Sequence, residues 1–196
     1  MIFTRELYLN QLIQKKQNGM VKIITGLRRC GKSFLLFNLF YNKLISQGVP
    51  ESHIIKIPLD NLDFIELRDK ISLYKFIKSK ITDNQQYYCF LDEIQLVKDF
   101  EEVLNSLLHI QNIDVYVTGS NSRFLVKDVI TEFRGRGDEI RLYPLSFKEF
   151  FENRDDDYIS AWTDYYTYGG LPLVAGMKTH KEKSDYLVIC GDYLNH

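Results

Sequence analysis

The sequence has no run of apolar residues that approaches the roughly 20 needed to cross a bilayer as a helix. Arg5 and Glu6 place charge where an export signal would be apolar, so we expect neither a membrane span nor a signal peptide. Its three cysteines, Cys30, Cys89 and Cys190, are scattered and form no C-x-x-C pair. They therefore suggest neither a disulfide framework nor a zinc site, and they favour a cytoplasmic location.

An excess of charge of one sign is also missing. Lys and Arg number 25 and Asp and Glu number 26, which gives the 196 residues a net charge of −1. This balance does not favour nucleic acid as a partner, although a local basic patch remains compatible with it. The chain is 45% hydrophobic and 26% charged, so we expect a folded protein with a core rather than a disordered one.

Short apolar segments alternate with amphipathic ones along most of the chain. We expect strands at 21–25, 54–57, 87–91, 113–117 and 139–143, and helices at 4–18, 32–47, 71–82, 100–108 and 122–129. This alternation predicts an α/β fold, with a parallel sheet between two layers of helices. After Pro144 only helices are expected, at 146–153 and 159–168. We therefore expect a first domain over 1–150 and a helical, lid-like segment over 151–196.

The segment Gly26–Ser33 fits the phosphate-binding pattern G-x-x-x-x-G-K-[ST], between an expected strand and an expected helix. Backbone N–H groups of such a loop surround a phosphate, and the helix dipole adds to the attraction. Lys32 is expected to contact the β- and γ-phosphates, and the Ser33 hydroxyl to bind Mg²⁺. The alternative is a glycine turn that happens to precede a lysine and a serine. The residues expected to bind the nucleotide here are Gly26, Leu27, Arg28, Arg29, Cys30, Gly31, Lys32, Ser33 and Phe34.

The apolar strand expected at 87–91 ends in two carboxylates, Asp92 and Glu93. At the carboxyl end of a parallel strand such side chains point into the ligand crevice. Asp92 suits Mg²⁺ binding, and Glu93 suits a general base that polarises the attacking water. The alternative is that two acids simply open a solvated loop. A water-activating glutamate favours a nucleotide hydrolase over a small-molecule kinase, and the absence of the guanine-reading N-K-x-D favours ATP.

Two further groups of polar residues follow along the chain. Thr118, Ser120 and Asn121 end the next strand, where a polar side chain could sense the γ-phosphate or hold the attacking water; an ordinary turn has the same composition. Arg134 and Arg136 lie in the loop before the last strand. An arginine there can project from one subunit to the γ-phosphate bound by its neighbour, and the alternative is a surface charge.

Six segments in this order resemble a known family: Gly26–Ser33, Leu91–Gln95, Thr118–Asn121, Gly135–Arg136, Pro144–Phe147 and Gly169–Pro172. The series resembles the prokaryotic AAA-type ATPases whose P-loop domain is followed by a C-terminal domain of unknown function. The T-G-S-N, P-L-S-F and G-G-L-P segments narrow this resemblance, since many ATPases share the other motifs. The resemblance implies ATP and Mg²⁺, and a three-layer αβα P-loop NTPase fold with a parallel sheet of AAA type. In that sheet the strand ending at Thr118 lies between the P-loop strand and the strand carrying Asp92.

The segment Gly170–Leu173 also looks like the G-L-P-L segment of signal-transducing ATPases with numerous domains. The proline packs near adenine in those proteins, so the resemblance implies a base contact for Pro172. Family members are commonly longer than this chain, and the residues after 150 are expected to begin a larger C-terminal region.

Three functional hypotheses follow. The first is an ATPase that hydrolyses ATP with Mg²⁺ to drive a conformational change in a partner or an attached domain. The second is a slow nucleotide-gated switch, an interaction module with little turnover. The third, a DNA-associated motor, rests on fold analogy and on Arg28 and Arg29 alone. The expected partners are a second copy of the chain and an unidentified protein, with no membrane.

Overall fold

The computed structural model describes residues 2–119, 135–152 and 154–192. Contacts divide the chain into two compact units. The sheet unit consists of Glu6–Gly26 and Lys32–Leu142, and the helical unit of Met1–Arg5, Leu27–Gly31 and Tyr143–His196. The boundary expected near residue 151 stays a prediction. No helix in the described ranges is long and apolar enough to cross a membrane.

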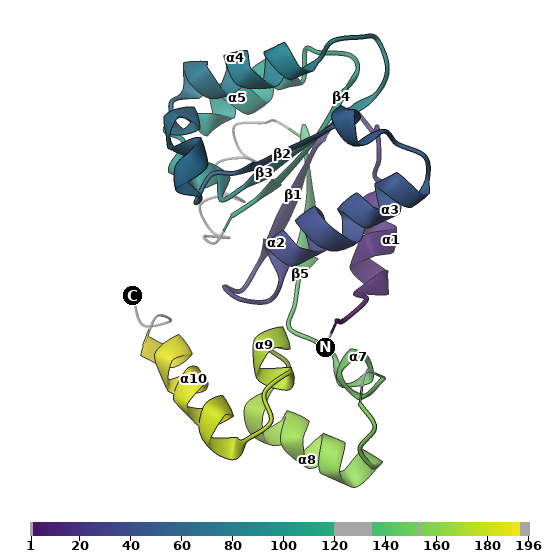
Figure 1. Cartoon of the computed structure of the whole chain (residues 1–196), viewed down its shortest axis with the longest axis vertical. Coiled ribbons are helices and arrows are strands. Elements are labelled where there is room, and N and C mark those ends of the chain that lie inside the picture. Colours follow the sequence, from purple (N-terminus) through teal and green to yellow (C-terminus); the bar gives the residue numbers. More distant parts are fainter. Residues whose placement is uncertain (1, 120–134, 153, 193–196) are drawn as a thin grey trace. The chain divides into compact units, whose positions relative to one another are not determined.

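The sheet unit is built on five parallel strands in the order β2-β3-β4-β1-β5 (Figure 1). The strands are β1 (Val21–Gly26), β2 (Ile54–Pro58), β3 (Tyr87–Asp92), β4 (Ile113–Thr118) and β5 (Gly137–Leu142). The expected α/β class is confirmed, and β4 lies between the P-loop strand and the strand carrying Asp92. Every residue of β1 and β3 is buried. For β3 this agrees with its continuous apolar run, which is typical of a strand covered on both faces.

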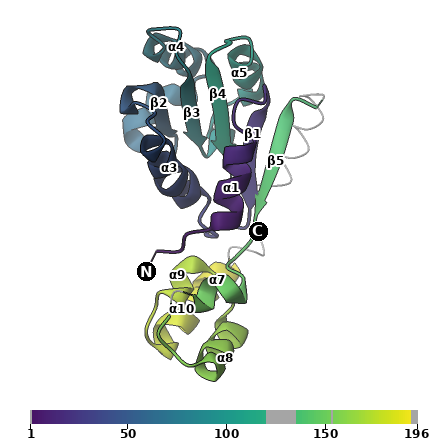
Figure 2. The same ribbon diagram turned by 90° about the vertical axis from the view of Figure 1, so that its right-hand side faces the viewer.

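Helices cover both faces of this sheet (Figure 2). They are α1 (Glu6–Gln14), α2 (Lys32–Phe34), α3 (Tyr41–Ser46), α4 (Lys70–Lys80) and α5 (Phe100–Leu107). Alternate residues of each strand face opposite helical layers. Cys89 and Leu91 join the core beneath α4 and α5, whereas Phe90 packs on Phe40, which precedes α3, at a ring distance of 5.6 Å. Even-numbered residues of β3 therefore face the helices that follow the P-loop.

The helix expected over 32–47 forms, but not as one regular α-helix. Between α2 and α3 the chain takes a six-residue π-helical segment, η1 (Leu35–Phe40). Its turns carry Phe37 and Phe40 onto the sheet, where Phe37 lies 6.1 Å from Phe90 and Phe40 lies 4.8 Å from Tyr116. Segments of π-helix inside helices are frequent near functional sites.

Other boundaries also differ from the sequence-based expectation. Helix α1 ends at Gln14 rather than at residue 18, and Gln17 has a left-handed backbone with φ of 56°. Three 3₁₀ segments were not expected: η2 (Glu51–His53), η3 (Leu62–Arg68) and η4 (Ile94–Leu96). The helix expected at 122–129 lies outside the described residues.

A charged cluster lies inside the sheet unit. Lys22 of β1 is fully buried and forms an ion pair with Asp114 of β4. Asp114 also accepts hydrogen bonds from the Tyr116 hydroxyl at 2.7 Å and from the Gln17 backbone N–H at 2.9 Å. Burial lowers the pKa of Lys22, and the attraction of Asp114 opposes that shift. This network ties the end of α1 to the two central strands.

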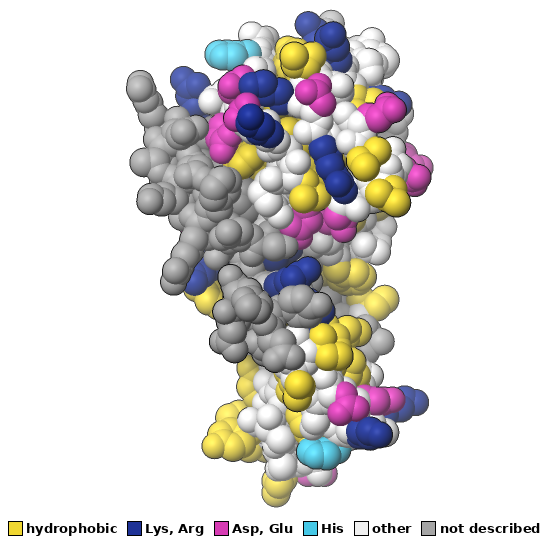
Figure 3. All heavy atoms as spheres, turned by 90° about the vertical axis from the view of Figure 1, so that its left-hand side faces the viewer, with side chains coloured by type: hydrophobic (Ala, Val, Ile, Leu, Met, Phe, Trp, Pro, Cys, Tyr) yellow, Lys and Arg dark blue, Asp and Glu magenta, His cyan; other side chains and the backbone are white. Residues whose placement is uncertain are grey.

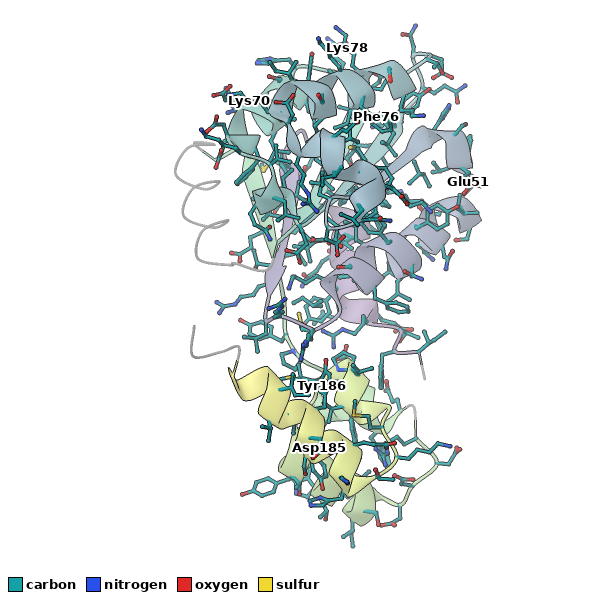
Figure 4. All side chains as sticks on the ribbon, turned by 60° about the vertical axis from the view of Figure 1, so that its left-hand side comes forward. Glu51, Lys70, Phe76, Lys78, Asp185 and Tyr186 are labelled. Atoms are coloured by element: carbon teal, nitrogen blue, oxygen red, sulfur yellow. The ribbon has the colours of Figure 1, made fainter. Side chains whose placement is uncertain are left out.

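The surface of the sheet unit mixes charges of both signs. On the face shown in Figure 3, acidic and basic side chains are intermingled. Lys70 of α4 contributes one such pairing, because its Nζ lies 3.1 Å from Asp99 and 2.9 Å from Glu102 (Figure 4). Exposed pairs of this kind add little stability, but they agree with the near-neutral composition.

The helical unit contains α7 (Phe147–Phe151), α8 (Tyr158–Tyr168), α9 (Pro172–Ala175) and α10 (His180–Asp192). A capping box of Ser146 and Glu149 starts α7, and Asp157 caps α8. Its core is Phe3, Leu145, Phe150, Ala161 and Ala175. The helices expected after Pro144 are confirmed; α10 forms beyond the two helices that were expected there.

Candidate active site

The site is built where β3 and β4 end side by side. Asp92 is the last residue of β3 and Thr118 the last of β4, and the preceding residues, Leu91 and Val117, are paired in the sheet. The Thr118 hydroxyl donates a hydrogen bond to Asp92 Oδ1. The same Thr118 oxygen accepts the backbone N–H of Glu93 at 3.2 Å. One hydroxyl therefore holds both members of the acidic pair.

Ser33 reaches the same carboxylate from the other side. It lies in α2, the helix that follows the P-loop, and forms a hydrogen bond with Asp92. The even-numbered positions of β3 face the layer that contains α2, which is why Asp92 turns toward Ser33 rather than toward α5. Strands β3, β4 and β1 are neighbours in that order, so three separate parts of the chain converge on one carboxylate.

The electrostatics of Asp92 favour a bound cation. Burial raises the pKa of Asp92, the hydroxyls of Thr118 and Ser33 oppose this shift, and the negative charge of Glu93 adds to it. Among the residues that the structure describes, there is no cluster of three or more His, Cys, Asp or Glu that could hold a metal alone. One carboxylate and one hydroxyl fit Mg²⁺ best, because Mg²⁺ commonly takes few protein ligands and completes its shell with water and phosphate oxygens.

Lys32 lies at the start of α2 with its side chain buried. Its Nζ donates a hydrogen bond to the backbone carbonyl of Gly26, the last residue of β1, at 3.1 Å. The ammonium group is therefore held at the carboxyl end of the P-loop strand. In contrast to Lys32, the next two residues predicted to contact the nucleotide, Ser33 and Phe34, are exposed.

Glu93 has a strained backbone and a held side chain. Its φ of 53° and ψ of 49° place it in the left-handed region, which non-glycine residues enter mainly at turns and functional sites. Its carboxylate accepts a hydrogen bond from Gln95 Nε2. The other Gln95 amide atom, Oε1, is buried and has no hydrogen-bond partner in the described part of the chain. Sequence reasoning assigned Gln95 no role, although it lies in the L-D-E-I-Q segment.

Residues Leu27–Gly31 of the P-loop belong to the helical unit. Arg29, with φ of 68°, donates a hydrogen bond from Nη1 to Cys190 Sγ at 2.8 Å. Its guanidinium lies over the ring of Tyr186 at 4.9 Å, and both partners belong to α10 (Figure 4). Sequence reasoning could not find these contacts, because the residues are more than 150 positions apart.

A cavity of about 220 Å³ lies in the helical unit. Its lining is Leu27, Arg28, Arg29, Pro144, Tyr168, Gly169, Gly170, Leu171 and Cys190. Pro172 does not line it but lies close to the loop, since its Cγ would be 3.9 Å from a Cβ on Gly31. Gly170 allows the close packing of this wall, because a Cβ there would lie 2.2 Å from the Leu145 carbonyl oxygen.

The structure describes only one of the remaining predicted residues, Arg136, and does not bring it to this site. Ser120, Asn121 and Arg134 lie outside the described residues. Arg136 is exposed, and its carbonyl oxygen accepts the N–H of Val21, the first residue of β1, at 2.9 Å. Within the sheet unit Arg136 therefore lies at the opposite end of β1 from the P-loop.

Comparison with known proteins places the chain in a family. A family model described as an AAA domain matches residues 18–151. An uncharacterized protein of Haemophilus influenzae is 35% identical over 179 residues, which are 88% of this chain and 44% of that protein. The uncharacterized protein MJ1544 of Methanocaldococcus jannaschii is 27% identical over 183 residues, which are 85% and 39% of the two chains. The chain thus spans less than half the length of these curated relatives.

Two solved structures are similar in fold. Caenorhabditis elegans PCH-2 has a TM-score of 0.54 at 14% identity, over 76% of this chain and 44% of that one. The ADP form of Aeropyrum pernix ORC2 has a TM-score of 0.51 at 14% identity, over 87% and 58%. At these identities the similarity concerns the fold alone.

Proposed function

The chain belongs to the AAA-domain family, and we propose that it binds ATP together with Mg²⁺ and hydrolyses the γ-phosphate bond. The observation that carries this proposal is the convergence on Asp92, which receives hydrogen bonds from Ser33 and Thr118 at the edge where the P-loop strand ends. A buried carboxylate that accepts from two hydroxyls, with a buried lysine directly before one of them in sequence, is suited to magnesium-bound phosphates.

Each side chain has one task in this proposal. Bound Mg²⁺ would neutralise charge that develops on the transferred phosphoryl group. Ser33 and Asp92 hold the cation, and Lys32 exchanges its hydrogen bond to the Gly26 carbonyl for the β- and γ-phosphates. Glu93 accepts a proton from the attacking water, because it is the second carboxylate at the strand edge and its backbone is fixed by Thr118.

The cavity of the helical unit suits the base of the nucleotide. Its walls are mainly apolar, from Leu27, Pro144 and Leu171, and two P-loop arginines line it as well. A purine has an apolar face and polar edges, which fit such a lining. Pro172 lies near Gly31 of the loop and is the candidate base contact.

The direct test is ATP turnover by the purified chain, measured as phosphate release, with Mg²⁺ present and then chelated. Glu93→Gln should keep ATP bound and lower hydrolysis by about 10²–10⁴-fold, the usual effect of losing a general base. Lys32→Ala should lose nucleotide binding, whereas Lys43→Ala, in α3 of the same helical segment, should not. Unchanged ATP affinity in Lys32→Ala would contradict the P-loop assignment.

A slow nucleotide-gated switch is a second candidate, and one contact favours it. Arg29 of the P-loop contacts Tyr186 and Cys190 of α10. A change in the conformation of the loop would therefore alter the contacts of that helix. In this case the chain should retain nucleotide tightly, with no turnover that Glu93→Gln could remove. A steady rate lost in Glu93→Gln would instead support the enzyme.

We also propose what the energy of hydrolysis is used for. Since the curated relatives are more than twice the length of the matched segment, we infer that nucleotide state is passed to an attached domain or a protein partner. A second copy of the chain is the candidate partner at the nucleotide, through Arg136. Limited proteolysis of α10 with ATP, with ADP and without nucleotide would report such coupling.

A further inference from the structure

Gln95 sits in a turn that the core holds rigidly. The turn η4 follows Glu93 and is closed by hydrogen bonds from Leu96 N to Glu93 O and from Val97 N to Ile94 O, each 3.0 Å. Ile94 and Val97 are buried in the main core of the sheet unit. The position of Gln95 relative to Glu93 is therefore set by packing rather than by a mobile loop.

Two residues in the described part of the chain, Thr118 and Gln95, contact Glu93 at different points. Its backbone N–H donates to the Thr118 hydroxyl, and its carboxylate accepts from Gln95 Nε2. Glu93 makes the contact with Gln95 from a left-handed backbone, directly before η4. A glutamate side chain has three rotatable bonds, so the second contact selects one of many directions for the carboxylate.

This arrangement leaves one polar atom of the Gln95 amide without a partner, which lowers the free energy of unfolding. Its Oε1 is buried and lacks a hydrogen-bond partner among the described residues. A buried acceptor without a partner lowers stability, and an apolar side chain of the same size would avoid the loss. Gln95 thus leaves one amide atom unpaired while the other is used at the neighbouring Glu93 carboxylate.

We propose that Gln95 is the positioning residue of the general base: its amide N–H holds the Glu93 carboxylate in the direction needed to accept a proton from the attacking water. This inference rests on the proposed ATP hydrolysis. Proton transfer requires the base within hydrogen-bond reach of the water, and small misplacements of catalytic groups slow reactions strongly. Gln95 acts through Glu93 and not on the nucleotide.

The test is Gln95→Leu, which keeps the side-chain size and removes the amide. We expect kcat to fall by about 10²-fold, because the carboxylate loses its fixed direction. The Kd for a fluorescent ATP analogue with Mg²⁺ should not change, because Ser33, Asp92 and Lys32 are untouched. The urea midpoint of unfolding should stay equal or rise, since the unpaired carbonyl is gone. A merely structural glutamine would give a lower midpoint.

Gln86→Leu is the matched control. Gln86 is also half-buried and donates its amide to a backbone carbonyl, that of Tyr87 at 2.9 Å, but at the opposite end of β3. The Gln86→Leu variant should leave kcat unchanged.

In a Glu93→Gln background, Gln95→Leu should have no further effect on the single-turnover rate, because the effects of two residues that act as one unit are not additive.

The outcomes separate the two proposals. If the wild type hydrolyses ATP and Gln95→Leu keeps its kcat, or weakens nucleotide binding as much as kcat, the positioning role is wrong and the hydrolase proposal stands. Additive effects in the Glu93→Gln background also overturn the positioning role. A wild type without turnover overturns both.

Discussion

Thr118 and Asp92 are 26 residues apart in sequence, and the Thr118 hydroxyl donates directly to the Asp92 carboxylate. The contact exists because β3 and β4 are adjacent parallel strands that end at the same level. It also reaches Glu93, whose N–H donates to the same oxygen. The proposed metal ligand and the proposed base are thus coupled through one hydroxyl.

Thr118→Val removes this hydroxyl and keeps the side-chain shape. We expect Mg²⁺ affinity in the presence of nucleotide to fall by about 10- to 100-fold, as is usual when a partner that orients a metal ligand is lost. Isothermal titration with Mg²⁺ and a non-hydrolysable ATP analogue measures it. Thr163→Val, which removes a hydroxyl bonded to the Ile159 carbonyl in α8, is the control and should change nothing. Equal Mg²⁺ affinity in both variants would contradict the role of Thr118.

Asp92→Asn should make the protein more stable at neutral pH while it loses Mg²⁺ binding. Burial raises the pKa of Asp92 above that of the unfolded chain, so its charge costs free energy in the folded state. The unfolded state binds fewer protons in the window between the usual value of 3.8 and the raised one. This group's contribution to stability is therefore present at low pH and lost as pH rises through the raised pKa.

Urea unfolding of wild type and Asp92→Asn at a series of pH values measures this effect. The variant should have the higher midpoint at neutral pH, and the difference should narrow as pH falls and wild-type Asp92 takes up a proton. A less stable variant at neutral pH would show that the hydrogen bonds from Ser33 and Thr118 outweigh the desolvation of the charge.

Gly170→Ala should destabilise the helical unit by about 1–3 kcal/mol, the usual cost of overpacking. The added Cβ would lie 2.2 Å from the Leu145 carbonyl oxygen, and the backbone must move to relieve this clash. Gly176→Ala is the matched control, because its Cβ would lie 3.5 Å from the nearest atom, at an ordinary φ of −83°. That change should be neutral or slightly stabilising. Equal unfolding midpoints for the two variants would contradict the close packing of the G-G-L-P segment.

Local patterns predicted what depends on a few neighbouring residues. The strands were found because each is a short segment with several apolar or β-branched residues, and the P-loop because Gly26–Ser33 carries its own motif between a strand and a helix. Helix α10 was missed, because the segment around Lys181 has weak helical periodicity and is ordered by contacts such as Lys183 with Asp164.

The candidate site was predicted only as separate residues. Nothing in the sequence states that Thr118 meets Asp92, since that contact depends on strand order and register. The pairing of Gln95 with Glu93 depends on a left-handed backbone at Glu93, which sequence patterns assign to glycine or asparagine rather than glutamate. The ion pair of the buried Lys22 could not be predicted for the same reason, because its partner Asp114 comes from another strand.

Arg136 lies beside Val21, whereas the P-loop motif begins at Gly26, at the other end of β1. The five residue steps of β1 span about 17 Å, which is further than an arginine side chain extends. An exposed arginine at this end is available to a second copy of the chain.

If Arg136 completes a neighbour's site, the ATPase rate per chain should rise with protein concentration. Arg136→Ala and Lys32→Ala should each be inactive alone, because one lacks the arginine and the other the phosphate-binding lysine. Their mixture should recover activity, since a Lys32→Ala subunit can offer Arg136 to an intact P-loop in its partner. Arginines of this kind contribute about 10³–10⁵ in rate, so even partial recovery is measurable. Arg141→Ala, in β5, is the control. A rate per chain that is flat with concentration, together with no recovery on mixing, would make Arg136 a surface residue.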